Sequence, residues 1–172
     1  MSEAAMDQTS ERDALVKAIV ERLARQHTTA MVLFHHAVAE RLRLGPTDHK
    51  CLDLLREREA LTGSELAGLT GLTTGAVTGV VARLEKAGYL RREPDPWDRR
   101  KQVLRPVPER VEEIHRVITP LRAEVAELLD RFDAHQLAAI ADFLSGTAEI
   151  GHRQAAVLRA ESLTRTHNRS EP

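Results

Sequence analysis

Basic side chains are concentrated in one segment of the chain, between Thr73 and Arg105. This segment holds eight Lys or Arg residues against four acidic ones, a local balance of +4, whereas all 172 residues together carry a formal charge of −1. The basic residues are Arg83, Lys86, Arg91, Arg92, Arg99, Arg100, Lys101 and Arg105. Grouped cations can neutralise the phosphates of nucleic acid, so the segment is a candidate surface for binding double-stranded DNA.

The elements that would position these residues are two short helices and a hairpin. Thr62 and Glu65 have the spacing of a capping box and open the first helix. A second helix, Thr73–Lys86, follows a tight turn that contains glycine, and a basic hairpin with a Pro- and Asp-rich tip follows near Arg91–Arg105. This order is typical of a winged helix-turn-helix, in which the second helix enters the major groove.

Four motifs in this region resemble the MarR family of bacterial transcriptional regulators. They are Glu65-Leu66-Ala67, Gly75-Ala76-Val77-Thr78, Arg83-Leu84-Glu85-Lys86-Ala87-Gly88-Tyr89-Leu90 and Asp95-Pro96-Trp97-Asp98-Arg99-Arg100. The resemblance covers roughly residues 42–105 by motif. It implies a sequence-specific regulator, usually a repressor, that acts as a homodimer on a pseudo-palindromic operator.

The Asp-x-Arg element of the wing is the most telling part of this resemblance. It falls on Asp98 and Arg100, with Arg99 between them. An arginine in the narrow minor groove gains from the negative potential there, and a neighbouring carboxylate can hold its flexible guanidinium in the inserting direction. The resemblance therefore places all three residues at the DNA, with Arg100 inserting and Asp98 orienting it.

Small polar residues begin the predicted recognition helix, where they can reach phosphates or base edges without blocking entry into the groove. The candidates for DNA contact are Thr73, Thr74, Gly75 and Thr78, together with Ser64 and Arg83. Thr73 suits helix capping and DNA contact equally, whereas Thr78 lies opposite the apolar face and is expected to be a contact. Gly79 stands where the family often has a long polar side chain, so we expect the readout to rely on DNA shape.

Two apolar stripes flank the winged segment. Leu15–Leu42 repeats at helical spacing, and Leu137–Leu158 forms a near-heptad stripe of mostly small residues. Both are too extensive for one chain to cover, so we predict a homodimer. Between them, Pro108 can start a helix that Pro120 is expected to kink or restart, with Thr119 as the new cap.

The expected fold is mainly α with a small β-wing. Aromatic residues make up only 3% of the chain, so aliphatic residues must form the core, which suits packed helices. We expect an N-terminal tail and dimerisation helix over 1–44 and a winged helix-turn-helix DNA-binding lobe over 45–107. C-terminal dimerisation helices are expected over 108–160 and a flexible tail over 161–172.

The other reactive residues form no recognisable catalytic or metal site. The single cysteine, Cys51, excludes an intramolecular disulfide and is predicted to be a core residue. The eight histidines lack zinc-ligand spacing and are expected mostly at the surface, although His35 and His36 are candidates for bordering an effector cavity. Without a phosphate loop or a nucleophile motif, we expect no enzyme, no cofactor and no metal.

The sequence also predicts where the protein is located and which partners it has. The chain has no uninterrupted run of 18 apolar residues and no basic N-terminal leader, which favours the cytoplasm and no membrane contact. The resemblance implies a small-molecule effector, an aromatic or amphipathic anion, that binds between the dimer arms and the winged lobe. The alternative function is a dimeric helical scaffold or protein-binding module that uses the winged-helix fold without binding DNA.

Overall fold

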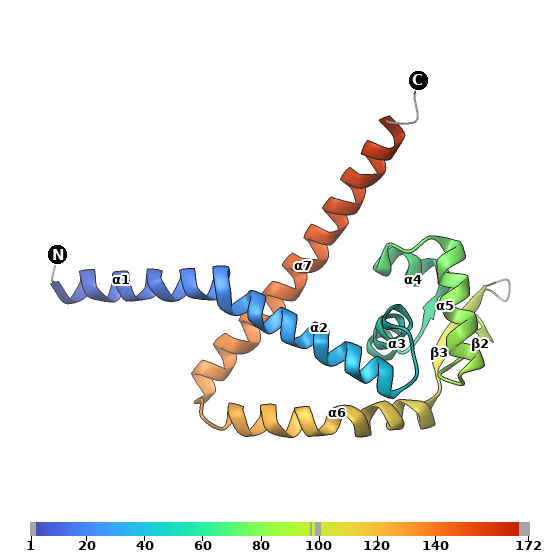
Figure 1. The fold of residues 1–172 in the computed structure, drawn as a ribbon, viewed down its shortest axis with the longest axis horizontal. Helices are drawn as coiled ribbons and strands as arrows, with labels where there is room; N and C mark the ends of the chain where they lie inside the picture. Colours follow the sequence, from blue (N-terminus) through green and yellow to red (C-terminus); the bar gives the residue numbers. More distant parts are fainter. Residues whose placement is uncertain (1–2, 97, 99–100, 169–172) are drawn as a thin grey trace. The chain divides into compact units, whose positions relative to one another are not determined.

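The chain divides into two compact units in the computed structural model, Met1–Lys50 and Cys51–Pro172. Figure 1 draws the helices and strands of both units. The structure describes residues 3–96, 98 and 101–168. None of the helices in these ranges combines the length and the apolar character that a membrane span requires.

Most of the first unit is one long run of helix. α1 (Glu3–Ala18) continues through a π-helical turn (Ile19–Leu23) into α2 (Ala24–Arg41), and the backbone is helical at both junctions. The helix predicted for Leu15–Leu42 is therefore present, and it begins earlier in the chain than the apolar stripe.

One histidine of the first unit is buried. His35 of α2 and His49 lie with their ring centroids 5.5 Å apart, and His49 is only 3% exposed. The expectation that the histidines lie at the surface is therefore wrong for His49, because the apolar spacing in the sequence does not show which polar residue is enclosed. His35 and His36 are exposed, and their place beside an effector cavity stays a prediction.

The winged helix-turn-helix lies in the second unit, in the predicted order. α3 (Pro46–Arg58) leads into it from the end of the first unit. The elements that follow are β1 (Leu61–Thr62), α4 (Gly63–Thr70), α5 (Thr74–Lys86), β2 (Leu90–Pro94) and β3 (Gln102–Pro106). Gly71 and Gly88 stop the two helices with φ of 73° and 76°, a left-handed conformation that glycine adopts without strain.

The three strands form an antiparallel sheet in the order β1-β3-β2. Arg91 lies opposite Arg105, and Leu61 lies opposite Leu104. The sequence predicted the hairpin but not β1, because two residues are too short to show the alternation of a strand. β1 pairs with the edge of β3 that the hairpin would otherwise leave open.

Aliphatic side chains from α3, α4, α5 and α6 form the core of this lobe. The largest fully buried side chains include Leu52, Leu55, Leu66, Leu84 and Ile114. Burial of each such side chain contributes about 1.5–3 kcal/mol. Cys51 is also buried, which confirms its prediction as a core residue.

The first of the two C-terminal helices, α6 (Pro108–Leu129), has Pro108 in its first turn, as predicted. It continues through Pro120, so of the two expected outcomes the restart is wrong, and the kink stays a prediction. The Thr119 hydroxyl caps no new helix and instead donates to the carbonyl oxygen of His115 at 2.8 Å. Proline removes one main-chain donor, and the turns on either side keep the helix together despite that loss.

The last helix, α7 (Ala134–Asn168), begins with a reciprocal capping pair. The Asp133 carboxylate accepts from the Gln136 N–H at 2.8 Å, and the Gln136 side chain accepts from the Asp133 N–H at 2.9 Å. The helix continues past Ala160, where we expected a flexible tail to start. Once a helix is nucleated, each added residue gains a hydrogen bond, so even a polar segment can extend it.

Candidate nucleic-acid interface

A reciprocal capping box fixes the start of α4. The Thr62 hydroxyl accepts from the Glu65 main-chain N–H at 3.2 Å, and Glu65 Oε2 accepts from the Thr62 N–H at 2.6 Å. The hydrogen bond from the Thr62 main chain, followed by the one from its hydroxyl, holds the pKa of Glu65 below its usual value. The box leaves Ser64, a predicted DNA contact, exposed in the first turn of α4.

Thr73 caps α5, the predicted recognition helix. Its hydroxyl accepts from the Ala76 N–H at 3.2 Å, which confirms the capping role, whereas its contact with DNA stays a prediction. Thr74 begins the helix. The Thr78 hydroxyl donates to the carbonyl oxygen of Thr74 at 2.9 Å, which occupies its only proton.

A groove of about 540 Å³ runs between the starts of α4 and α5 and the base of the wing. Its lining residues are Thr62, Gly63, Ser64, Glu65, Thr74, Val77, Thr78, Lys101 and Gln102. Three predicted contacts, Ser64, Thr74 and Thr78, thus meet two residues of the wing. From the sequence, Lys101 was only one of eight basic residues of the segment and Gln102 was not selected, because only the folded sheet brings the start of β3 to the helices.

Among the described residues, four predicted contacts do not line this groove: Thr73, Gly75, Arg83 and Asp98. Gly75 and Arg83 are exposed on α5 without lining it. Arg83 lies about two and a half turns along the helix from Thr74, so a contact from Arg83 would fall on a different part of a bound duplex.

Asp95 closes the loop of the wing. The Asp98 N–H donates to the Asp95 carboxylate at 2.9 Å, and the Lys101 N–H donates to the carbonyl oxygen of Asp98 at 2.8 Å. Arg99 and Arg100 lie outside the described residues. The roles of Arg100 as the inserting residue and Asp98 as the orienting residue therefore stay predictions.

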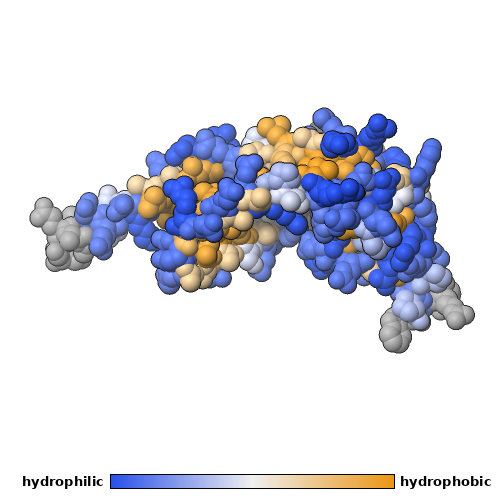
Figure 2. All heavy atoms as spheres, turned by 90° about the horizontal axis from the view of Figure 1, so that it is seen from below, coloured by the Kyte–Doolittle hydropathy of each residue, from blue (hydrophilic) through white to orange (hydrophobic). Residues whose placement is uncertain are grey.

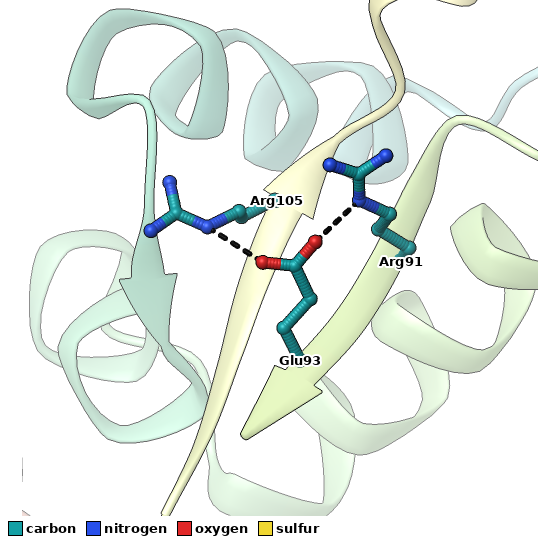
Figure 3. Close-up of polar contacts among 3 residues, drawn as sticks. All are labelled: Arg91, Glu93 and Arg105. Atoms are coloured by element: carbon teal, nitrogen blue, oxygen red, sulfur yellow. Dashed lines mark hydrogen bonds and ion pairs between the residues drawn. The ribbon is translucent and has the colours of Figure 1, made fainter. Parts of the chain in front are cut away.

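Ion pairs neutralise part of the basic segment at the base of the wing. Glu93 lies between two arginines, with its carboxylate oxygens 2.6 Å from Arg91 Nε and 2.9 Å from Arg105 Nε (Figure 3). Arg92 Nε lies 3.0 Å from Glu85 Oε2. These partly exposed pairs contribute at most about 1 kcal/mol each, but they link β2 to β3 and to α5.

A cation–π contact attaches α6 to the end of α5. The Arg110 guanidinium lies 4.8 Å from the centroid of the Tyr89 ring, and its Nη2 donates to the carbonyl oxygen of Ala87 at 2.9 Å. Burial raises the pKa of Tyr89, and the charge of Glu113 adds to this effect while Arg110 opposes it. The side chain of Arg110 thus joins the end of the recognition helix to α6, in addition to the main chain that connects them.

The sequence comparisons agree with this geometry. The model of the MarR family matches residues 44–101. The uncharacterised HTH-type transcriptional regulator YcgE of Bacillus subtilis is 41% identical over 145 residues, which cover 84% of this chain and 94% of the relative. The chain belongs to the MarR family. Its members are DNA-binding transcription factors with a winged helix, and they are not enzymes.

Solved structures of regulators share the fold of this MarR-family protein. The transcriptional regulator Tm0710 from Thermotoga maritima is 26% identical, with a TM-score of 0.57 over 80% of this chain and 96% of that one. Apo MarR from E. coli is 21% identical, with a TM-score of 0.53 over 73% of this chain and 93% of that one. These likenesses confirm the mainly helical fold with a small antiparallel sheet.

Glu65→Gln tests the capping box that holds the start of α4. At neutral pH the wild type should be more stable, because a carboxylate accepts from the Thr62 N–H more strongly than an amide does. The pKa of Glu65 is lowered by folding, so this advantage is complete above the ordinary carboxyl pKa and disappears as the pH falls through the lowered value.

The side chain is exposed, so the expected difference in Tm is small, about 1–3 °C. Thermal melts of both proteins across a pH series measure it. A difference in Tm between the two proteins that stays the same at acid pH would contradict the role of the Glu65 carboxylate charge.

Proposed function

We propose that this MarR-family protein is a ligand-responsive repressor that binds a specific double-stranded operator in the cytoplasm as a homodimer. The observation that carries the proposal is the groove beside α5, where Ser64, Thr74 and Thr78 lie with Lys101 and Gln102. Hydroxyl, ammonium and amide groups are suited to phosphate oxygens and base edges. In a two-fold dimer, two such helices lie about one turn of DNA apart, which favours a pseudo-palindromic operator.

Large exposed apolar side chains support the homodimer. Among the residues the structure describes, these exposed side chains are Leu15, Val16, Val20, Leu23, Val32, Leu33, Val125, Leu128, Phe132, Phe143, Leu144, Ile150, Val157 and Leu158. All lie on the helices that flank the winged lobe or in their connection, and Figure 2 shows apolar side chains reaching the surface. Apolar surface on this scale marks an interaction site, and a second copy of the chain would cover it.

Leu144→Asp should therefore weaken the dimer. Leu144 is 52% exposed on α7, within the stripe Leu137–Leu158, and a carboxylate there would have to be buried in the interface. We expect sedimentation to show a dimer for the wild type at micromolar concentration and mostly monomer for the variant. Ala138→Asp, on the polar side of α7 with Asp142 and Glu149, is the matched control and should remain dimeric. A monomeric wild type would rule out the homodimer.

The DNA-binding proposal is tested first by selecting duplexes from a random-sequence pool. We expect the selected duplexes to be pseudo-palindromic and their affinity to fall steeply with salt, because bound phosphates release counterions. If no duplex is retained, the scaffold alternative replaces the proposed function.

The selected duplex then tests the wing. Arg100→Ala should lower affinity at least about tenfold, since each dimer loses two guanidiniums and a good contact contributes on the order of 1–3 kcal/mol. The free energy of unfolding of the variant should stay within roughly 0.5 kcal/mol of the wild-type value, because a side chain whose contacts are with DNA contributes little to folding. Arg58→Ala, at the exposed end of α3, is the control and should leave affinity near that of the wild type.

Asp98→Ala separates orientation from simple charge. The substitution removes a negative charge near DNA, so electrostatics alone predicts tighter binding, whereas an orienting role predicts weaker binding. We expect weaker binding in the same titration. Tighter binding by Asp98→Ala, or unchanged binding by Arg100→Ala, would contradict the proposed wing mechanism.

A cavity of about 360 Å³ in the second unit is suited to the proposed effector. It is lined by Arg56, Glu59, Arg91, Arg105, Pro106, Val111 and His115. Arg91 and Arg105 pair with Glu93 through Nε, and the Arg56 Nε is buried with no hydrogen-bond partner among the described residues. Several guanidiniums beside apolar Pro106 and Val111 match a carboxylate on an aromatic ring, and the volume is within the range of ligand sites.

Benzoate is a suitable probe for this cavity. We expect it to raise the Tm of the wild type by a few degrees and to weaken binding of the selected duplex, because it would favour one arrangement of the dimer over another. Arg105→Gln should lose both responses, while Arg58→Gln, which lies outside the cavity, should keep them. If neither response depends on Arg105, the effector does not bind here.

A further inference from the structure

The outward face of α5 consists of small residues over its first two turns. The inner face is buried, and at 3.6 residues per turn the positions opposite it are Gly75, Gly79 and Ala82. Thr78 lies beside them. The first long exposed side chain along the helix is that of Arg83, in the third turn.

The fold requires neither glycine of this face. A Cβ at Gly75 would meet no neighbouring atom within 4 Å, and one at Gly79 would meet only the flexible end of Arg83, at 3.3 Å from Nη1. Neither glycine has a positive φ, unlike Gly71 and Gly88. Glycine makes a helix less stable than alanine does, and close approach of a surface outside the chain would offset this cost.

Thr78 presents a methyl group and oxygen lone pairs to that surface, but no proton. Its hydroxyl proton is used by the carbonyl oxygen of Thr74, 2.9 Å away. A threonine in this state cannot donate to the acceptors of guanine. It can contact a methyl group and accept a hydrogen bond.

The major groove offers that combination at an A·T pair, which carries the thymine methyl and the adenine N6 donor. Guanine is read mainly by Arg or Lys and adenine by Asn or Gln, and the outward face has none of these in its first two turns. We propose that α5 approaches the base edges closely and reads thymine methyl groups through Thr78, Ala82 and the helix surface at Gly75 and Gly79. This inference rests on the proposed DNA binding.

Deoxyuridine provides the direct test, because it differs from thymidine only by the missing methyl group. In the duplex selected from the random pool, each half-site should contain thymine in the major groove facing α5. Replacing one such thymine by deoxyuridine should lower affinity about fourfold, the effect of losing one buried methyl-sized group. Replacing thymines outside the footprint should have no effect.

Two variants of Thr78 assign the contact. Thr78→Val keeps the methyl group and should remain sensitive to deoxyuridine, whereas Thr78→Ser removes it and should bind both duplexes with similar affinity. This pairing of protein and DNA changes distinguishes a methyl contact from a general loss of helix stability.

Gly79→Ala tests the close approach. It should raise Tm by about 1–3 °C, because alanine favours the helix, and lower affinity for the duplex at least about fivefold. Gly68→Ala, at an exposed glycine of α4 with open space around it, should raise Tm similarly and leave affinity unchanged. Duplex binding that is insensitive to deoxyuridine in both half-sites would overturn the inference and leave the proposed function intact, whereas failure to bind any duplex would overturn both.

Discussion

Burial of the inner face of α5 is the constraint on which the candidate interface depends. Val77, Val80, Val81 and Leu84 are each at most 3% exposed. Since successive residues of a helix are 100° apart, burying these four also fixes which residues face away from the core. Turning the helix by one residue would move Thr78 out of the groove and expose valines to water. The hydrophobic core therefore sets the orientation of the polar surface.

The other contacts of the lobe keep α5 and the wing in one arrangement. The two helix caps, at Thr62 and Thr73, fix where α4 and α5 begin. The pair between Glu85 and Arg92 joins α5 to β2, and Arg110 joins α6 to the end of α5. The cavity with Arg91 and Arg105 is lined by α3, β2, β3 and α6, so an occupant would touch elements that are themselves attached to the recognition helix.

The winged lobe and the flanking helices differ in how they cover apolar surface. Among the described residues, the large side chains of the lobe are buried by its own helices and sheet, whereas α1, α2, α6 and α7 leave many exposed. A hairpin alone is marginally stable, and packing of its strands against α5 and pairing with β1 complete the small sheet. The long helices lack such cover within the described chain, which is the physical reason to expect a second copy.

The sequence by itself determined what depends on neighbouring residues. The capping box at Thr62, the glycine stops after both helices and the hairpin strands follow from local hydrogen bonds and φ preferences. Tertiary structure alone decided that Gln102 lines the groove, that His49 is buried and that β1 pairs with β3. The structure also shows that α6 continues through Pro120. These features depend on contacts between residues far apart in the chain or on the surrounding helix, and neither residue type nor spacing encodes them.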